Sequence, residues 1–260
     1  MLKNQIKSFA KVNIFLKITG QQDAYCTLSS RFVRLENLYD ILSFEPENTK
    51  NEFNLLGDFS CKLEDNTIYK AFLALRQNCP KIDAYFRVYS VRVKKNIPEF
   101  AGLGGGSSNA AAFLLLANKV FDLDYSKDRL ARIASQIGAD VPFFIYEYSS
   151  ANVSGIGEVV ELFEEEPLRV ETFTPDIKCS TKKVYDCFRK DFYKTISQEQ
   201  SKKLFSMKSK DILKSLDTAG ANDLFEPALS LYPKLKEAQA KLQNQDYYFC
   251  GSGSSFFKVL

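Results

Sequence analysis

The stretch PEFAGLGGGSSNAAAFLLLANKV, residues 98–120, constrains the fold more than any other part of the sequence. It holds glycine at positions 102, 104, 105 and 106. Because glycine has no Cβ, this segment can adopt positive φ angles and approach another group closely. Ser107, Ser108 and Asn109 are residue types that cap helices, and the alanines and leucines that follow are strong helix formers. The pattern predicts a tight loop that leads into a helix over 107–120.

The start of this helix is suited to an anion. The first N–H groups of a helix have no partner within it, and the helix dipole adds partial positive charge there. A merely flexible turn is the alternative, but so many glycines directly before a helix favour a phosphate site. Two familiar phosphate loops are excluded. No Gly-Lys-Ser/Thr follows the glycines, and Ser107 stands where a dinucleotide-binding loop has its third glycine.

Composition limits the chemistry that the chain can perform. The sequence contains no histidine, which excludes Ser-His-Asp and Cys-His catalysis and any metal held by histidine. Acid–base work must therefore come from Asp, Glu, Lys, Tyr or Cys. The six cysteines are far apart and form no C-x-x-C, so neither a zinc site nor a disulfide framework is indicated. We expect reduced, mostly structural thiols.

Length and charge indicate an ordinary globular protein. The 260 residues, 45% of them hydrophobic, are enough for one large domain or two modest ones. A net charge of +3 is a weak argument for nucleic-acid binding. No segment approaches eighteen consecutive apolar residues, and the N-terminus lacks the uninterrupted apolar core of a signal peptide. We expect a cytoplasmic protein that binds neither membrane nor nucleic acid.

The periodicity of apolar residues predicts an α+β fold. Alternation indicates strands over 4–19, 38–47, 51–57 and 81–96, and later over 155–163 and 167–175. Helical spacing indicates helices over 65–79, capped by Asp65 or Asn66, and over 127–137, with several more up to residue 242. The tail, 247–260, reads as strand, Gly-Ser-Gly turn and strand. A change of character near residue 150 predicts two domains, 1–150 and 151–260.

Three separated segments together resemble the GHMP family of small-molecule kinases. They are AKVNIFLKITG at 10–20, PEFAGLGGGSSNA at 98–110 and IGADVPFF at 137–144. GIGE at 155–158 and Gly-Ser-Gly at 251–253 follow in the family's order. The resemblance implies an N-terminal ATP-binding domain like the second domain of ribosomal protein S5. It also implies a C-terminal ferredoxin-like domain that contributes to a substrate cleft between the two.

The resemblance also implies roles for individual residues. Asp140 would be the base and Lys11 its neighbour, and ATP with Mg²⁺ would supply the phosphoryl group. The acceptor implied is 4-diphosphocytidyl-2-C-methyl-D-erythritol, phosphorylated on its 2-hydroxyl in the non-mevalonate isoprenoid pathway. The residues implied to bind ATP are Asn66, Lys95, Pro98, Glu99, Phe100, Ala101, Gly102, Leu103, Gly104, Gly105, Gly106, Ser107 and Ser108. Those implied to bind the acceptor are Asn13, Tyr25 and Cys26.

Several of these residues have simpler explanations from the sequence alone. Asp140, between Gly138 and Pro142, could be only a helix cap, and so could Asn66. Lys95 could be a solvated charge. Lys11 is harder to explain in this way, because a lysine in an apolar strand needs a partner. At Cys26 the family has a histidine, and a thiol is a poor hydrogen-bonding substitute, so backbone groups could replace that contact.

The implied metal and assembly are simple. We find no dedicated carboxylate ligand for Mg²⁺, which we expect the ATP phosphates to hold, with help from Ser107 or Ser108. A monomer or weak homodimer is expected. The alternatives are another GHMP kinase, of the homoserine, mevalonate or galactose type, a nucleotide-binding regulator without turnover, and a nucleic-acid-binding module.

Overall fold

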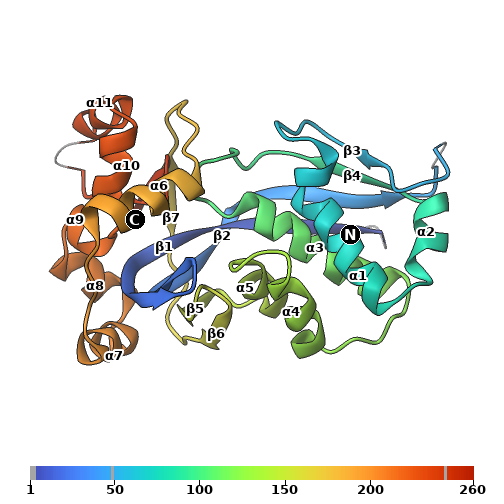
Figure 1. The fold of residues 1–260 in the computed structure, drawn as a ribbon, viewed down its shortest axis with the longest axis horizontal. Helices are drawn as coiled ribbons and strands as arrows, with labels where there is room; N and C mark the ends of the chain where they lie inside the picture. The colour runs from blue at the N-terminus through green and yellow to red at the C-terminus, as the bar shows by residue number, and fades with distance from the viewer. Residues whose placement is uncertain (1–3, 48–49, 243–244) are drawn as a thin grey trace. The chain divides into compact units, whose positions relative to one another are not determined.

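A computed structural model of the chain describes residues 4–47, 50–242 and 245–260 and shows an α+β fold (Figure 1). These residues form two compact units. The first unit contains the described residues up to Ala10, together with Glu36–Ile97 and Gly105–Glu147. The second contains Lys11–Leu35, Pro98–Gly104 and Tyr148–Leu260.

The chain passes between the units several times, because its first two strands are long. Strand β1 (Gln5–Gln22) and strand β2 (Tyr25–Glu45) each contribute residues to both units. The expected boundary near residue 150 lies close to the last crossing, between residues 147 and 148. The earlier crossings were not expected from the sequence. The assignment of 1–150 and 151–260 as the two domains stays a prediction.

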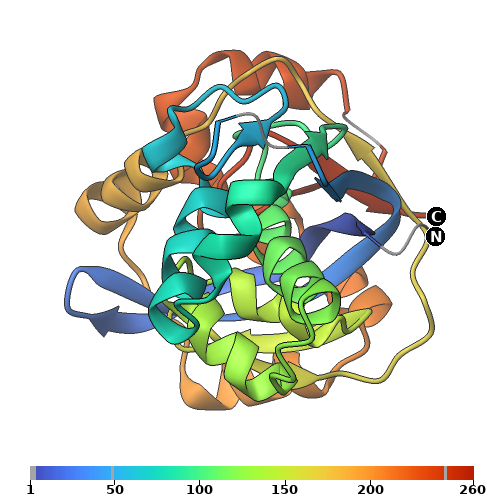
Figure 2. The ribbon, with the colours of Figure 1, turned by 90° about the vertical axis from the view of Figure 1, so that its right-hand side faces the viewer.

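The first unit packs helices around a core of phenylalanines. Its sheet places β4 (Ser90–Lys94) antiparallel to residues 41–45 of β2 and parallel to β3 (Leu55–Leu56). A 3₁₀ turn, Leu63–Asp65, precedes the helices α1 (Thr67–Asn78), α2 (Ile82–Val88), α3 (Gly105–Val120), α4 (Lys127–Ser135) and α5 (Val141–Tyr146). Helix α1 packs along α3 (Figure 2), and the buried rings of Phe44, Phe86 and Phe113 meet edge-on or tilted.

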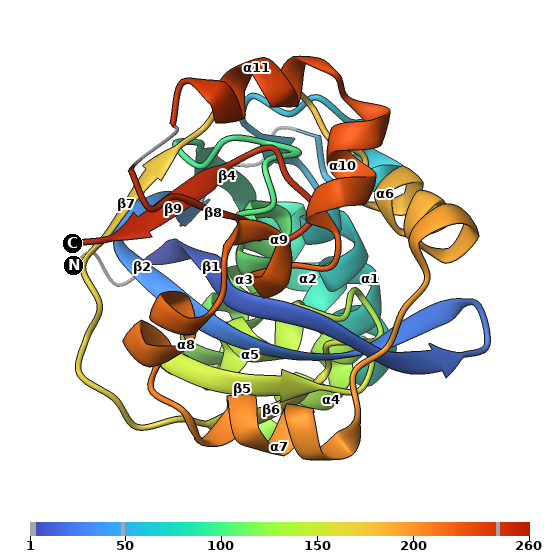
Figure 3. The ribbon, with the colours of Figure 1, turned by 90° about the vertical axis from the view of Figure 1, so that its left-hand side faces the viewer.

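The second unit has two groups of strands. Residues 30–33 of β2 pair antiparallel with β5 (Ser150–Ser154), which pairs with β6 (Val159–Leu162). A separate antiparallel sheet has the order β7 (Val170–Phe173), β9 (Phe256–Val259) and β8 (Tyr248–Phe249) (Figure 3). The helices are α6 (Thr181–Cys187), continued by a π-helical turn at Phe188–Phe192, α7 (Gln198–Ser206), α8 (Ser209–Ser215), α9 (Thr218–Ala221), α10 (Phe225–Leu231) and α11 (Lys234–Ala240).

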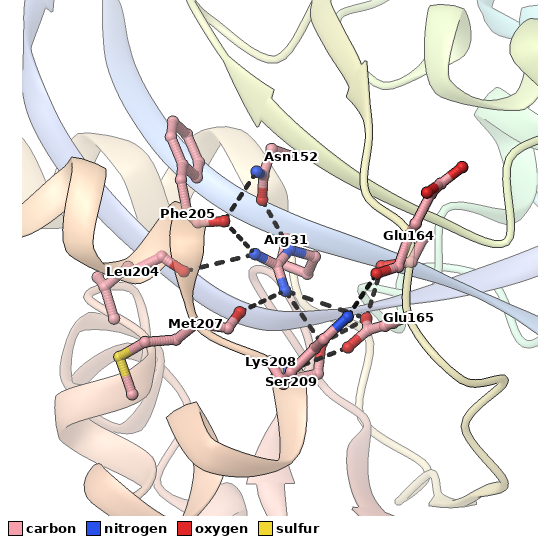
Figure 4. A network of polar contacts seen from close by, with 10 residues as sticks. Arg31, Asn152, Glu164, Glu165, Leu204, Phe205, Met207, Lys208 and Ser209 are labelled. Carbon is pink, nitrogen blue, oxygen red and sulfur yellow. Dashed lines mark hydrogen bonds and ion pairs between the residues drawn. The ribbon is translucent and has the colours of Figure 1, made fainter.

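A fully buried arginine ties the connection between α7 and α8 to β2 (Figure 4). Arg31 donates to the carbonyl oxygens of Phe205 at 2.9 Å and Met207 at 3.1 Å, and to Oδ1 of Asn152 at 2.7 Å. Its guanidinium lies 3.3 Å from the ring centroid of Phe163 and 4.0 Å from the Glu165 carboxylate. Burial lowers the pKa of Arg31 to about 10, and the charge of Glu165 partly opposes this shift. The side chain is still a cation at neutral pH.

Several expected elements differ from the structure. The strand expected over 51–57 is limited to Leu55–Leu56. The segment 81–96 was expected to be one strand, but Ile82–Val88 forms α2 and only Ser90–Lys94 is extended. The reason is that Ile82 and Phe86, four residues apart, bury one helical face. The helix expected over 107–120 begins at Gly105 instead, so Ser107, Ser108 and Asn109 lie inside the helix rather than before it. Among the described residues, no helix has the length and apolar character needed to cross a membrane.

Candidate active site

The glycine loop, residues 98–104, combines backbone strain with tight anchoring. Gly102 and Gly104 have φ angles of 75° and 71°, and Phe100 has a φ of 56°, which is unusual for an aromatic residue. The loop's carbonyl oxygens accept three hydrogen bonds within the second unit. The backbone N–H of Lys11 donates to Leu103, that of Ser255 to Ala101 and that of Cys179 to Phe100, at 3.0, 3.1 and 3.1 Å. The loop is therefore held in one conformation by its own carbonyls.

Gly102 is required by a close approach to the turn at 250–253. A Cβ at this position would lie 2.0 Å from the carbonyl oxygen of Cys250. In return, a Cβ at Gly251, where φ is 52°, would lie 3.1 Å from the carbonyl oxygen of Gly102. The two glycine turns pack backbone to backbone, which leaves no room for a side chain on either. The Gly-Ser-Gly near the C-terminus thus supports the glycine loop.

The first turn of α3 is suited to an anion. It contains no acidic residue, and its first N–H groups have no acceptor within the helix. Ser107 is half-buried, and its hydroxyl makes no hydrogen bond with another residue in the described part of the chain. The Ser108 hydroxyl is buried and accepts a hydrogen bond from Ser8 at 2.8 Å. Of the two serines, Ser107 is the one available to a ligand.

The start of α1 lies beside the start of α3. Thr67 Oγ1 donates to the carbonyl oxygen of Gly106 at 2.6 Å. Asn66 caps α1, since its Oδ1 accepts from the N–H of Ile68 at 2.9 Å. The capping explanation for Asn66 is therefore correct. Its position next to Thr67 also brings it close to the glycine-rich start of α3, and its contact with ATP stays a prediction.

Lys95 is not a solvated charge. Its side chain is only 13% exposed, and its ammonium donates to the buried carboxylate of Asp40 and, at 3.0 Å, to Oδ1 of Asn109. The structure thereby joins Lys95 to the N-terminal part of α3 through Asn109. The sequence analysis did not identify Asp40. One signal was present, because Asp40 is an acid flanked by Leu38, Tyr39, Ile41 and Leu42.

Lys11 is buried on β1, with a defined set of neighbours. It donates to Oδ1 of Asn13 at 2.7 Å, and its ammonium lies 4.5 Å from the ring centroid of Phe32. Asn13 in turn donates to Ser30 Oγ at 3.0 Å, so its amide orients the lysine. Burial raises the pKa of the Cys250 thiol, and the positive charge of Lys11 partly opposes that rise. Lys11 thus places a cation close to the turn that supports the glycine loop.

Asp140 immediately precedes α5 and is half-buried. It occupies the N-cap position, but its side chain makes no capping hydrogen bond, so the simple explanation as a helix cap is not supported. Asp140 belongs to the first unit and Lys11 to the second. Their pairing stays a prediction.

The two residues expected to read the nucleobase differ sharply in exposure. Tyr25 begins β2 directly after the turn at Asp23, and 62% of its surface is exposed. The Cys26 side chain is buried, with 4% of the residue exposed, and it offers a ligand almost no surface. This burial agrees with the alternative that backbone groups replace the contact of the family histidine.

Two further features bear on the site. Asn222, which the sequence analysis did not single out, donates to the carbonyl oxygens of Phe249 and Gly251 at 3.1 and 2.9 Å and so fixes the turn behind the glycine loop. No sequence pattern distinguishes it. Within residues 4–47, 50–242 and 245–260, no group of three or more His, Cys, Asp or Glu side chains is placed to hold a metal ion.

Comparison with known proteins identifies relatives across the whole chain. Residues 66–148 match the family model of the GHMP kinases N terminal domain. A protein of Sulfurimonas denitrificans named 4-diphosphocytidyl-2-C-methyl-D-erythritol kinase is 51% identical, over 97% of this chain and 96% of that protein. Proteins of the same name from a Sulfurovum species and from Campylobacter jejuni are 47% and 41% identical, each over 98% of this chain and 98% and 99% of their own length.

Solved structures agree with these relatives. A crystal structure of 4-(cytidine 5'-diphospho)-2C-methyl-D-erythritol kinase superposes with a TM-score of 0.74 at 27% identity, covering 98% of this chain and 89% of that one. The mevalonate kinase of Methanococcus jannaschii superposes with a TM-score of 0.56 at 12% identity, over 98% of this chain and 90% of that chain. At that identity the likeness shows the fold alone.

Proposed function

The chain belongs to the 4-diphosphocytidyl-2-C-methyl-D-erythritol kinases of the GHMP kinase family, and from this premise we propose that it phosphorylates that alcohol with ATP. The acceptor is its 2-hydroxyl, and the reaction is a step of the non-mevalonate route to isoprenoid precursors. The observation that carries the proposal is the 51% identity over nearly the full length of both chains. Two mevalonate kinases and a homoserine kinase that superpose on this chain are 12–15% identical to it, so they support the shared fold and give no reason to propose mevalonate or homoserine as the substrate.

The residues at the start of α3 fit the phosphates of ATP. The first N–H groups of α3 have no partners within the helix, and its first turn contains no acidic residue, so this helix start would accept oxygen anions. Mg²⁺, held mainly by phosphate oxygens with the Ser107 hydroxyl as a candidate protein ligand, would neutralise charge on the phosphates. The absence of a carboxylate cluster among the described residues is compatible with a metal that arrives with the nucleotide.

Transfer requires an activated hydroxyl. We assign Asp140 as the base that accepts the proton of the 2-hydroxyl while that oxygen bonds to the γ-phosphorus. The bond between the γ-phosphorus and the bridging oxygen breaks, and ADP leaves with the electron pair. Lys11, held by Asn13, would stabilise negative charge on the attacking oxygen. The exposed ring of Tyr25 would stack on the cytosine base.

The direct test is ADP release by the purified protein with Mg-ATP. We expect release to depend on 4-diphosphocytidyl-2-C-methyl-D-erythritol and to stay near background with homoserine, mevalonate or galactose. Substrate-independent release, or preference for another alcohol, would reject the assignment. We also propose that the enzyme works in the cytoplasm. We expect it to be a monomer or weak homodimer, and gel filtration of the active protein tests this oligomeric state.

A further inference from the structure

A single buried carboxylate fixes both ends of the glycine loop. Asp40, on β2, has no exposed surface. Its Oδ1 accepts from the backbone N–H groups of Asn96 and Ile97 at 2.6 and 2.8 Å, which lie just before the loop. Its Oδ2 accepts from Nδ2 of Asn109 at 2.8 Å and from the ammonium of Lys95. Asn109 follows the loop in the sequence. The residues that enter and leave the loop are therefore attached to the same side chain.

The contacts of Asp40 continue into the first turn of α3. The Asn109 amide is fully used, since Oδ1 accepts from Lys95 at 3.0 Å and Nδ2 donates both to Asp40 and to Ser8 Oγ, each at 2.8 Å. The Ser8 hydroxyl then donates to Ser108 at 2.8 Å. Ser8, Asn109 and Ser108 are all buried. This network sets the position of the helix start at which the proposed phosphate site lies.

The loop ends are also packed directly against each other. A Cβ at Gly105 would lie 2.9 Å from Cγ2 of Ile97. Because Ile97 is held by Asp40 through its backbone N–H, the carboxylate controls this contact as well. No acceptor other than a carboxylate could serve two backbone N–H groups, an ammonium and an amide at this place with the same geometry.

We propose that Asp40 is a positioning residue for the nucleotide, acting through the two ends of the glycine loop and not by touching ATP or the acceptor. The proposal rests on the function proposed above. It predicts a selective effect: a weakened loop geometry should reduce affinity for ATP while the acceptor site and the transfer step remain largely intact.

The test is steady-state kinetics of Asp40→Asn. Asparagine keeps the shape but turns an N–H₂ group toward Lys95 or the backbone donors, where an acceptor is needed. We expect KM for ATP to rise about 10-fold, with kcat and KM for the cytidine alcohol within about 3-fold of wild type. Glu165→Gln is the matched control. It removes another buried carboxylate, which accepts from the N–H of Ser209 at 3.0 Å in the second unit. It should leave all three constants unchanged.

Ser8→Ala provides the second variant should Asp40→Asn fail to fold. It removes the hydrogen bonds to Ser108 and Asn109 without altering charge, and we expect KM for ATP to rise about 3-fold. An unchanged KM for ATP in a folded Asp40→Asn enzyme, or in Ser8→Ala where the former does not fold, would overturn the inference. So would an equal rise of both KM values. Lack of kinase activity in the wild type would instead reject the proposed function itself.

Discussion

At the scale of single residues, the proposed chemistry depends on Asp140. Replacement by asparagine removes the proton acceptor, and we expect kcat to fall by about 10²–10⁴, the usual contribution of a positioned base. Nucleotide affinity should stay within about 3-fold, because the loop is untouched. Turnover and binding of a fluorescent ATP analogue measure the two effects. Asp122→Asn, at an exposed acid, is the control. Near wild-type turnover of Asp140→Asn would remove this assignment.

Phe100 allows a test of backbone strain in the loop. Its φ of 56° is unfavourable for any residue with a Cβ, and half of its surface is exposed. Phe100→Ala removes the ring and keeps the strain, whereas Phe100→Gly removes both. Relief of about 1–2 kcal/mol of strain is offset by about 0.4–1 kcal/mol of extra freedom in the unfolded chain. We expect the glycine variant to be more stable than the alanine variant by roughly 0.5–1 kcal/mol in urea unfolding. The reverse order would show that the loop relaxes without cost.

At the scale of elements, the two glycine turns that pack on each other are decisive. Gly102→Ala would set a Cβ 2.0 Å from the carbonyl oxygen of Cys250, at a φ of 75°. We expect it to destabilise the protein by about 2 kcal/mol or more and to weaken ATP binding. At Gly106, in the same loop-to-helix segment, a Cβ would lie 3.4 Å from Thr67 Oγ1, so Gly106→Ala should change stability little. Melting temperatures of both variants test this contrast.

The helices and strands also show which features of the fold can be predicted from sequence patterns. Asn66 capping α1 and the strand, turn and strand at the C-terminus follow from residue types and alternation, and the structure confirms them. Helix α2 was missed because a seven-residue segment rich in apolar and aromatic residues satisfies both periods. The start of α3 was displaced because Gly105 and Gly106 adopt helical φ angles while Gly104 does not. Glycine permits both helical and positive φ angles, and the tertiary contacts determine which of the two each glycine adopts.

Across the whole chain, the contacts that the sequence could not predict are hydrogen bonds between residues far apart in sequence. Asp40 forms hydrogen bonds with Ile97 and Asn109, which lie 57 and 69 positions further along the sequence. The hydrogen bond from Asn222 to Gly251 spans 29 positions. Local patterns contain no information about such partners. The family resemblance named Lys11 and the glycine loop as candidate site residues, and their roles stay predictions. It did not indicate that Cys26 would be buried or that Lys95 would be held by Asp40.

Arg31 is the clearest test of how the second unit is held together. Arg31→Ala would leave the carbonyl oxygens of Phe205 and Met207 and the carboxylate of Glu165 without their buried cation. We expect a loss of about 3–5 kcal/mol in the free energy of unfolding. Arg92, whose ion pair with Glu45 is exposed to solvent, is the control, and Arg92→Ala should lower the free energy of unfolding far less than Arg31→Ala. Similar losses from the two variants would contradict the importance of the Arg31 contacts.

The proposed reaction passes the terminal phosphoryl group of ATP to the cytidine-linked alcohol. It is tested most directly by following a label on the γ-phosphate of ATP during turnover and locating it by chromatography and phosphorus NMR. We expect one label in each molecule of product, on the 2-hydroxyl oxygen, for every ADP formed. Label found only in inorganic phosphate, or on any other position of the alcohol, would contradict it.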